Sequence, residues 1–212
     1  GDKMFPMNDK QHTSALILLG YCYLGKNELE KVKDIIENRL SSRKLILLDK
    51  INLLDYSHLK GEYLIATKEY KQARESFQEC IKLGEQLDFS TGILEAGIHL
   101  AEIDLLENRI DDAIKTLREN LRGARRLKLN DLICESGLLL SRCYLLKGMP
   151  GKSASIEERI KPILTKLDTV WLYEKIREFE KLYRQLQADF PSAQAMPDVL
   201  VKAINHRHET SP

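Results

Sequence analysis

The sequence predicts an all-α fold built from repeated helical hairpins, and three observations carry that prediction. No proline stands between Pro6 and Pro150, and proline is the residue that helix interiors exclude because its ring removes an amide donor and clashes with the preceding turn. Apolar residues in this interval recur at helical spacing and do not alternate as they would in strands. Residues about forty positions apart also match in size, which is the signature of an internal repeat.

The repeat is clearest where small residues return. Gly61, Ala101 and Ser141 are spaced by forty residues, and a step of 41 back from Gly61 reaches Gly20. Two helices joined by a short turn approach closely only where no bulky side chain intervenes, so we expect these small residues at helix contacts. Larger apolar residues keep the same register: Ile65, Leu105 and Leu145, and Phe77 with Leu117. Four copies cover most of the chain.

Each copy is predicted to be a helix, a short polar turn and a second helix. The predicted turns are residues 25–28, 68–69, 107–109 and 147–151. Cap-forming residues, whose side-chain oxygens accept the free amides of a first helical turn, mark helix starts between the copies: Asp88 with Ser90, Asn130 with Asp131, and Asp168 with Thr169. The fourth copy is the least regular, because we expect Pro150 and Gly151 in its turn and a kink or stop at Pro162.

The ends of the chain are predicted to differ from the repeats. Residues 1–13 are expected to form an N-terminal extension, in which Gly1 resembles the residue left by tag cleavage. The helical repeat domain is expected to span residues 14–190 and to include a capping helix at 169–190, since a solenoid must cover its last apolar face. Residues 191–212 are polar and contain prolines, which predicts a C-terminal tail.

Composition excludes several classes of protein. Hydrophobic residues make up 43% and charged residues 31%, with 33 Lys and Arg against 32 Asp and Glu, a net charge of +1. The chain is therefore neither collagen-like nor disordered, and no overall field attracts nucleic acid or membrane. No apolar run reaches the length of a membrane span.

The four cysteines lack C-x-x-C spacing, which favours a reducing compartment, the cytoplasm or alternatively the nucleus. Cys22 and Cys143 share one repeat position and are expected in the core.

The repeats resemble the tetratricopeptide (TPR) family. Leu19-Gly20 followed by Tyr23, and Tyr70 followed by Ala73 and Phe77, carry the likeness. The period of 40 or 41 exceeds the usual 34, and is similar to forty-residue variants in cell-polarity adaptors, kinesin light chains and maltose-type bacterial transcription activators. The resemblance implies a right-handed superhelical solenoid of about four antiparallel hairpins. It also implies a non-catalytic protein-interaction scaffold without a cofactor, and we expect this scaffold to belong to a larger protein or complex.

The resemblance further implies a concave groove lined by residues of the first helices. Carboxylates would surround the apolar Ile98 and Leu138 there, which favours a basic amphipathic segment of a partner protein. We expect Tyr21, Ile98 and Leu138 to be its anchors; the alternative is that all these residues are ordinary solvated helix positions. The predicted groove residues are Ile17, Tyr21, Asp55, His58, Glu62, Glu95, Ile98, Glu102, Glu135, Leu138 and Arg142.

No catalytic residue, cofactor or metal site is predicted. The basic run from Arg118 to Lys128 is expected to be a solvated face and not a nucleic-acid site, because the total charge is balanced. His206 and His208 lack a third ligand and are expected in a solvated tail. An alternative function is a regulatory domain of a bacterial transcription regulator that senses a peptide or sugar in the same concavity.

Overall fold

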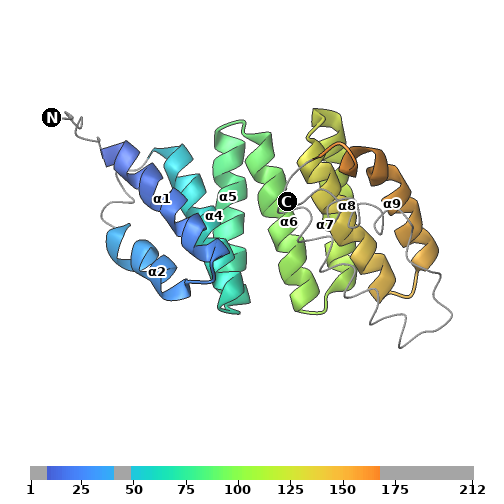
Figure 1. The fold of residues 1–212 in the computed structure, drawn as a ribbon, viewed down its shortest axis with the longest axis horizontal. Helices are drawn as coiled ribbons and strands as arrows, with labels where there is room; N and C mark the ends of the chain where they lie inside the picture. The colour runs from blue at the N-terminus through green and yellow to red at the C-terminus, as the bar shows by residue number, and fades with distance from the viewer. Residues whose placement is uncertain (1–8, 41–48, 168–212) are drawn as a thin grey trace, which may run out of the picture. The chain divides into compact units, whose positions relative to one another are not determined.

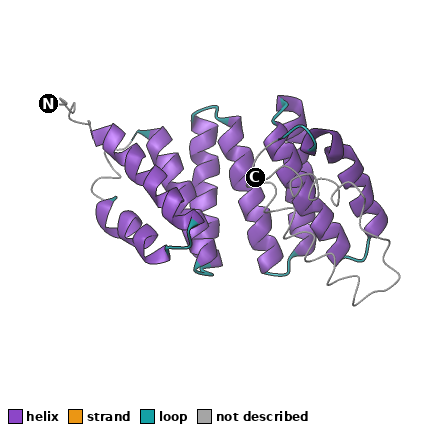
Figure 2. Cartoon of the chain, in the orientation of Figure 1, coloured by secondary structure: helices purple, strands orange, loops and turns teal. Residues whose placement is uncertain are grey.

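The structure is a computed structural model that describes residues 9–40 and 49–167, and every regular element in these ranges is helical (Figures 1 and 2). The prediction of an all-α fold is therefore confirmed. The elements in chain order are α1 (Asp9–Gly25), α2 (Leu29–Asp34), the π-helix η1 (Ile35–Arg39), α4 (Lys50–Ala66), α5 (Tyr70–Gln86), α6 (Ser90–Leu106), α7 (Ile110–Leu127), α8 (Asn130–Leu146) and α9 (Pro150–Leu164). None of these described helices is long and apolar enough to cross a membrane.

The chain divides into two compact units whose boundary lies between Ile103 and Asp104, within α6. Unit 1 contains α1, α2, η1, α4, α5 and α6 as far as Ile103. Unit 2 contains the end of α6 with α7, α8 and α9. The predicted capping helix and tail lie outside the described residues, and α1 begins at Asp9, before the expected start of the repeat domain at residue 14.

The turns inside the hairpins share one backbone geometry. Asn27, Lys68, Asn108 and Gly148 occupy the same repeat position, and all four have a left-handed backbone, with φ between 57° and 67°. The residue after each donates its amide back to a carbonyl five positions earlier, as from Glu69 to Leu64 at 2.8 Å. This is the closing bond of a Schellman motif, which satisfies carbonyls at a helix end. The turns therefore repeat as faithfully as the helices.

The small-residue prediction holds at Gly61 in unit 1. A Cβ atom at Gly61 would lie 2.6 Å from Cζ of Phe77, a residue of α5 that is fully buried. Gly20 serves a different contact, because a Cβ atom there would lie 2.5 Å from Cδ2 of Leu59 on α4. In the first copy the small residue thus accommodates the first helix of the next copy.

The fourth copy, in unit 2, has a polar contact at this place. The Ser141 and Ser153 hydroxyls lie 2.6 Å apart, and both donate to Oε1 of Glu157, at 2.5 and 2.9 Å. Glu157 stands where the earlier copies carry Phe77 and Leu117, and it is buried. A hydrogen-bonded network thus joins α8 to α9 where an aromatic ring joins α4 to α5.

Several local predictions are corrected. Pro150 is the first residue of α9 and lies outside the turn, since the first helical position needs no amide donor. Pro162 lies inside α9, which ends two residues later at Leu164. Cys22 is exposed, whereas Cys143 is buried. Asn130 is the first residue of α8 and does not cap it. A cap that we did not predict is Asp49, whose Oδ1 accepts a hydrogen bond from the main-chain amide of Asn52 at 2.9 Å at the start of α4.

Candidate functional site

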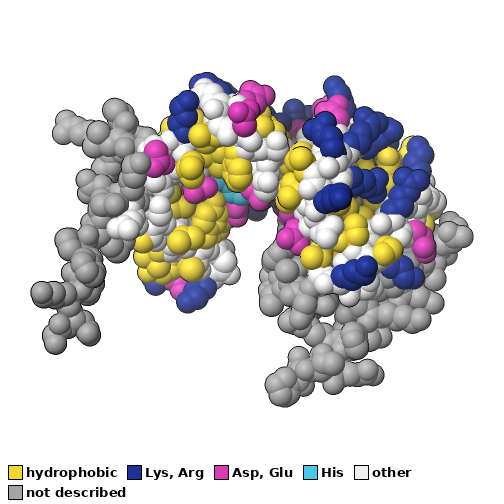
Figure 3. Space-filling view, turned by 90° about the horizontal axis from the view of Figure 1, so that it is seen from above, with side chains coloured by type: hydrophobic (Ala, Val, Ile, Leu, Met, Phe, Trp, Pro, Cys, Tyr) yellow, Lys and Arg dark blue, Asp and Glu magenta, His cyan; other side chains and the backbone are white. Residues whose placement is uncertain are grey.

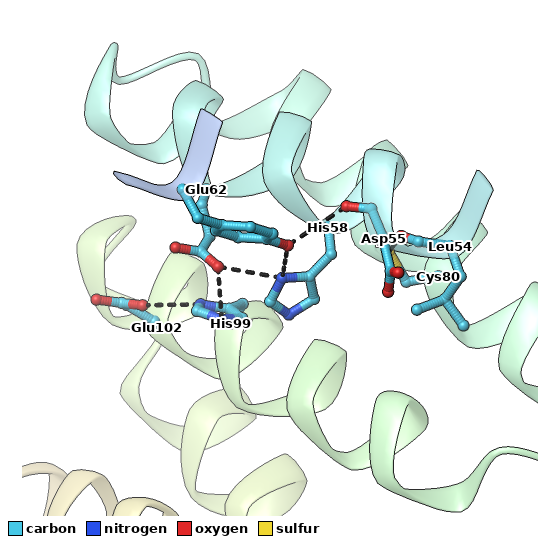
Figure 4. Close-up of polar contacts among 8 residues, drawn as sticks. Leu54, Asp55, His58, Glu62, Cys80, His99 and Glu102 are labelled. Atoms are coloured by element: carbon cyan, nitrogen blue, oxygen red, sulfur yellow. Dashed lines mark hydrogen bonds and ion pairs between the residues drawn. The ribbon is translucent and has the colours of Figure 1, made fainter. Parts of the chain in front are cut away.

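Three first helices of unit 1 bring polar side chains together at one place (Figure 4). His58 and Glu62 lie one turn apart on α4, so their side chains share one face of the helix. Tyr21 reaches them from α1, and His99 with Glu102 reaches them from α6. We call this set, together with Asp55, the polar cluster: Tyr21, Asp55, His58, Glu62, His99 and Glu102.

Hydrogen bonds and ion pairs join the polar cluster across the helices. Nδ1 of His58 lies 3.1 Å from Oε1 of Glu62 and 3.0 Å from the Tyr21 hydroxyl. That hydroxyl donates to the main-chain carbonyl of Asp55 at 3.3 Å. Nε2 of His99 lies 4.0 Å from the same Oε1 of Glu62, and its Nδ1 lies 3.3 Å from Oε2 of Glu102. Glu62 therefore faces two imidazoles.

The Phe77 ring packs against the imidazole rings of both histidines. Phe77 stacks on the His99 ring with centroids 4.8 Å apart and planes 13° apart. It meets the His58 ring edge-on at 5.5 Å, and the two imidazoles meet each other edge-on at 4.9 Å. Because Phe77 is also the ring that packs on Gly61, the repeat packing itself positions the imidazoles.

The surroundings shift the pKa values of the polar cluster. Burial alone would raise the pKa of Glu62, but the hydrogen bond from His58 and the charge of His99 hold it below its usual range. Burial raises the pKa of Asp55. Burial, with the nearby Glu62 and Asp55 carboxylates, raises the pKa of Tyr21. Glu62 is therefore an anion at neutral pH, and Tyr21 remains a neutral phenol that can donate a hydrogen bond.

The polar cluster is partly open to solvent. The side chains of His58 and His99 are 14% and 16% exposed, and those of Glu62 and Glu102 are 28% and 36% exposed. The space-filling view shows histidine surface bordered by acidic and apolar side chains, and it shows Lys and Arg side chains gathered over the helices of unit 2 (Figure 3). A ligand that reaches the polar cluster would meet negative charge first.

The structure separates the predicted groove residues into three groups. Tyr21, Asp55, His58, Glu62 and Glu102 belong to the polar cluster. Ile17, Ile98 and Leu138 are only 2%, 1% and 4% exposed, so Ile98 and Leu138, the two apolar anchors that we expected, are core residues with almost no exposed surface. Elsewhere, Glu95 on α6 and Glu135 and Arg142 on α8 are half-buried.

His99 is the member of the polar cluster that sequence reasoning missed. A strict forty-residue register aligns it with Leu59, a fully buried residue, and so assigns it to the core. The available signal was its spacing of three residues from Glu102, which places both on one face of a helix.

A separate cavity of about 460 Å³ between α4 and α5 is lined by none of the predicted groove residues; its lining is Tyr56, Ser57, Lys60, Gln72, Glu75, Ser76 and Glu79.

Comparison with solved structures decides the fold. Nearly identical TPR-like repeats assigned to a kinesin light chain of Podosopora anserina superpose with a TM-score of 0.66 over 97% of this chain and all of that one, at 15% identity. The chain has the TPR-like repeat fold. The apo form of RapI gives a TM-score of 0.71 at 13% identity, covering 93% of this chain and 72% of that one.

A third TPR-like structure contains a bound peptide. NprR in complex with its cognate peptide NprX gives a TM-score of 0.63 at 12% identity, and the match covers 96% of this chain and 63% of NprR. No family model and no curated protein sequence matches the chain. At these identities the TPR-like likeness establishes the arrangement of helices, and the chemistry of the site has to be argued from this chain's own residues.

Proposed function

We propose that this TPR-like chain is a non-catalytic interaction module that binds a segment of a partner protein, and that the polar cluster of unit 1 is part of the binding surface. The observation that carries the proposal is the convergence of polar side chains from three successive first helices onto one partly exposed place. Polar residues that only keep a protein soluble point into water and do not need to contact one another across helices. The peptide in the NprR structure supports a polypeptide as the ligand of this fold.

The charge of the polar cluster favours a basic segment. Glu62 is anionic, and Glu102, which pairs with His99, adds a second carboxylate to the polar cluster. A Lys or Arg side chain of the ligand would replace the water around these groups with charge-assisted hydrogen bonds. Tyr21 adds an aromatic ring, which can contact a cation or an aliphatic stem. The apolar share of the contact must come from other residues than Ile98 and Leu138, since both are buried.

Titration calorimetry with a basic amphipathic peptide, selected for binding from a display library, tests this proposal. The variant Glu62→Gln/Glu102→Gln should bind about tenfold more weakly than the native protein, because truncating a partly buried charged partner costs more than truncating a solvated one. The matched control is Glu75→Gln/Glu79→Gln on α5, which removes the same charge elsewhere in unit 1 and should leave the affinity unchanged. Equal affinities for all three proteins would remove the polar cluster from the binding surface.

A peptide-sensing regulatory domain is the second candidate, and the NprR complex is the observation that favours it. A sensor has to change its helix arrangement when the ligand binds. Small-angle scattering with and without the selected peptide separates the two: an unchanged radius of gyration supports a scaffold, and a change supports a sensor.

A further inference from the structure

We propose that His58, Glu62 and His99 form a binding site for a divalent transition-metal ion. In the described part of the chain these three residues place one nitrogen, one oxygen and one further nitrogen within 4.8 Å of one another. Two imidazoles and one carboxylate are a donor set that zinc and its neighbours in the first transition row accept. The site would leave one coordination position for water or for a ligand atom.

The distances allow a tetrahedral ion once the two imidazole rings have moved toward each other. Zinc bonds of 2.0–2.1 Å place tetrahedral donor atoms about 3.4 Å apart. Oε1 of Glu62 lies 3.1 Å from Nδ1 of His58 and 4.0 Å from Nε2 of His99, so the two observed distances bracket the required one. All three donor atoms lie within 4.8 Å of one another, so the two imidazole nitrogens have to approach each other by up to about 1.4 Å when the ion binds.

The outer contacts of the site also suit a metal. Nδ1 of His99 lies 3.3 Å from Oε2 of Glu102, and because a carboxylate only accepts, the Nδ1–H donates; in the neutral ring, Nε2 then carries the lone pair that a metal accepts. A carboxylate that orients a ligating imidazole in this way is a common feature of zinc sites. The Tyr21 hydroxyl keeps the Asp55 carbonyl as its acceptor when Nδ1 of His58 turns to a metal.

The fold holds the donors in place without the metal. His58 and Glu62 are separated by one turn of the same helix, and Phe77 packs against both imidazole rings.

The metal site goes beyond the proposed function and does not rest on it. A bound dication would neutralise Glu62, so it should compete with a basic peptide for the polar cluster, and the competition is reciprocal. Failure of peptide binding would leave the metal site standing, and absence of metal binding would leave the peptide proposal standing, provided that the peptide titration is run with a chelator.

Zinc titration of the full chain, freed of any affinity tag and of metal, tests the site. We expect one zinc ion per chain, bound on the order of 100-fold more weakly by Glu62→Gln and by His99→Gln, and about tenfold more weakly by Glu102→Gln. Two controls should keep native affinity: His12→Gln, which removes an exposed histidine of α1, and His206→Gln/His208→Gln. Native affinity in Glu62→Gln and His99→Gln, loss of binding in a control, or no binding at all would overturn the proposal.

A measurement on the unaltered protein guards against variants that misfold. Cobalt is a paramagnetic substitute for zinc, and in an NMR spectrum of the imidazole groups it should shift or broaden the His58 and His99 signals at one equivalent while His12 is unaffected. The visible absorption of the cobalt form should show the intense bands of four-coordinate geometry. Broadening confined to other histidines would overturn the site independently of any substitution.

Discussion

The contact between Gly61 and Phe77 gives the sharpest prediction about packing. Substituting Gly61→Ala puts a methyl group 2.6 to 2.9 Å from three ring carbons of Phe77. The ring is fully buried and is held between His58 and His99, so it cannot move away cheaply. Overpacking costs about 1–3 kcal/mol, and the better helix propensity of alanine returns up to about 1 kcal/mol. We expect a net loss of about 1–2 kcal/mol in the free energy of unfolding.

The chain itself suggests the compensating change. The third copy carries Ala101 and Leu117 at the positions of Gly61 and Phe77, and both are fully buried. Phe77→Leu should therefore make room for the new methyl group, and the double variant Gly61→Ala/Phe77→Leu should be more stable than the sum of the single effects predicts. For residues in direct contact we expect a coupling of about 1 kcal/mol.

Urea unfolding followed by circular dichroism at 222 nm measures all four proteins. Gly151→Ala is the matched control, because this glycine lies inside α9 with nothing within 4 Å of the added carbon, and the substitution should stabilise by up to about 1 kcal/mol. Strict additivity of the two single changes, or a Gly61→Ala protein as stable as the native one, would refute the packing argument.

Four further outcomes are expected. Gly148→Ala should cost about 1 kcal/mol of unfolding free energy in the same urea experiment, because φ is +67° there; Asp49→Ala should cost about as much by removing the cap on α4, and Asp49→Asn should restore most of it. At pH 8 only Cys22 should react with iodoacetamide, and quantitative labelling of more than one thiol in the native protein would contradict the burial of the others. Burial raises the pKa of the other three thiols to about 12, and since the unfolded chain loses these protons near pH 9, stability should fall as the pH rises from 9 toward 12; a flat profile would contradict this. The three thiols are Cys80, Cys134 and Cys143.

The repeated hairpins could be predicted from the sequence because their cause is local and recurs. The small residue at Gly61 and the large residue at Phe77 have counterparts of similar size forty positions along the chain. The absence of proline between Pro6 and Pro150 independently indicates helices. The left-handed turn position at Asn27 and Lys68 was equally visible by its spacing, but only its last copy is a glycine, which hid the common backbone geometry.

The polar cluster could be predicted only in part. Tyr21, His58 and Glu62 follow from their helix positions, whereas His99 depends on how far α6 is rotated about its own axis, which a strict register does not give. Burial depends likewise on neighbours far along the chain. Ile98 has the repeat position of His58 and is nevertheless inaccessible, and Cys22 has the position of Cys143 and is nevertheless exposed.

The histidines of the polar cluster report most directly on the central claim, that this cluster is part of a polypeptide-binding surface. NMR spectra of the imidazole groups, recorded with a chelator present while the selected basic peptide is added, follow each histidine by itself. The account predicts that the signals of His58 and His99 move together and saturate with the calorimetric affinity, while His12 stays in place. A peptide that binds with the same affinity and leaves both signals unmoved would contradict it.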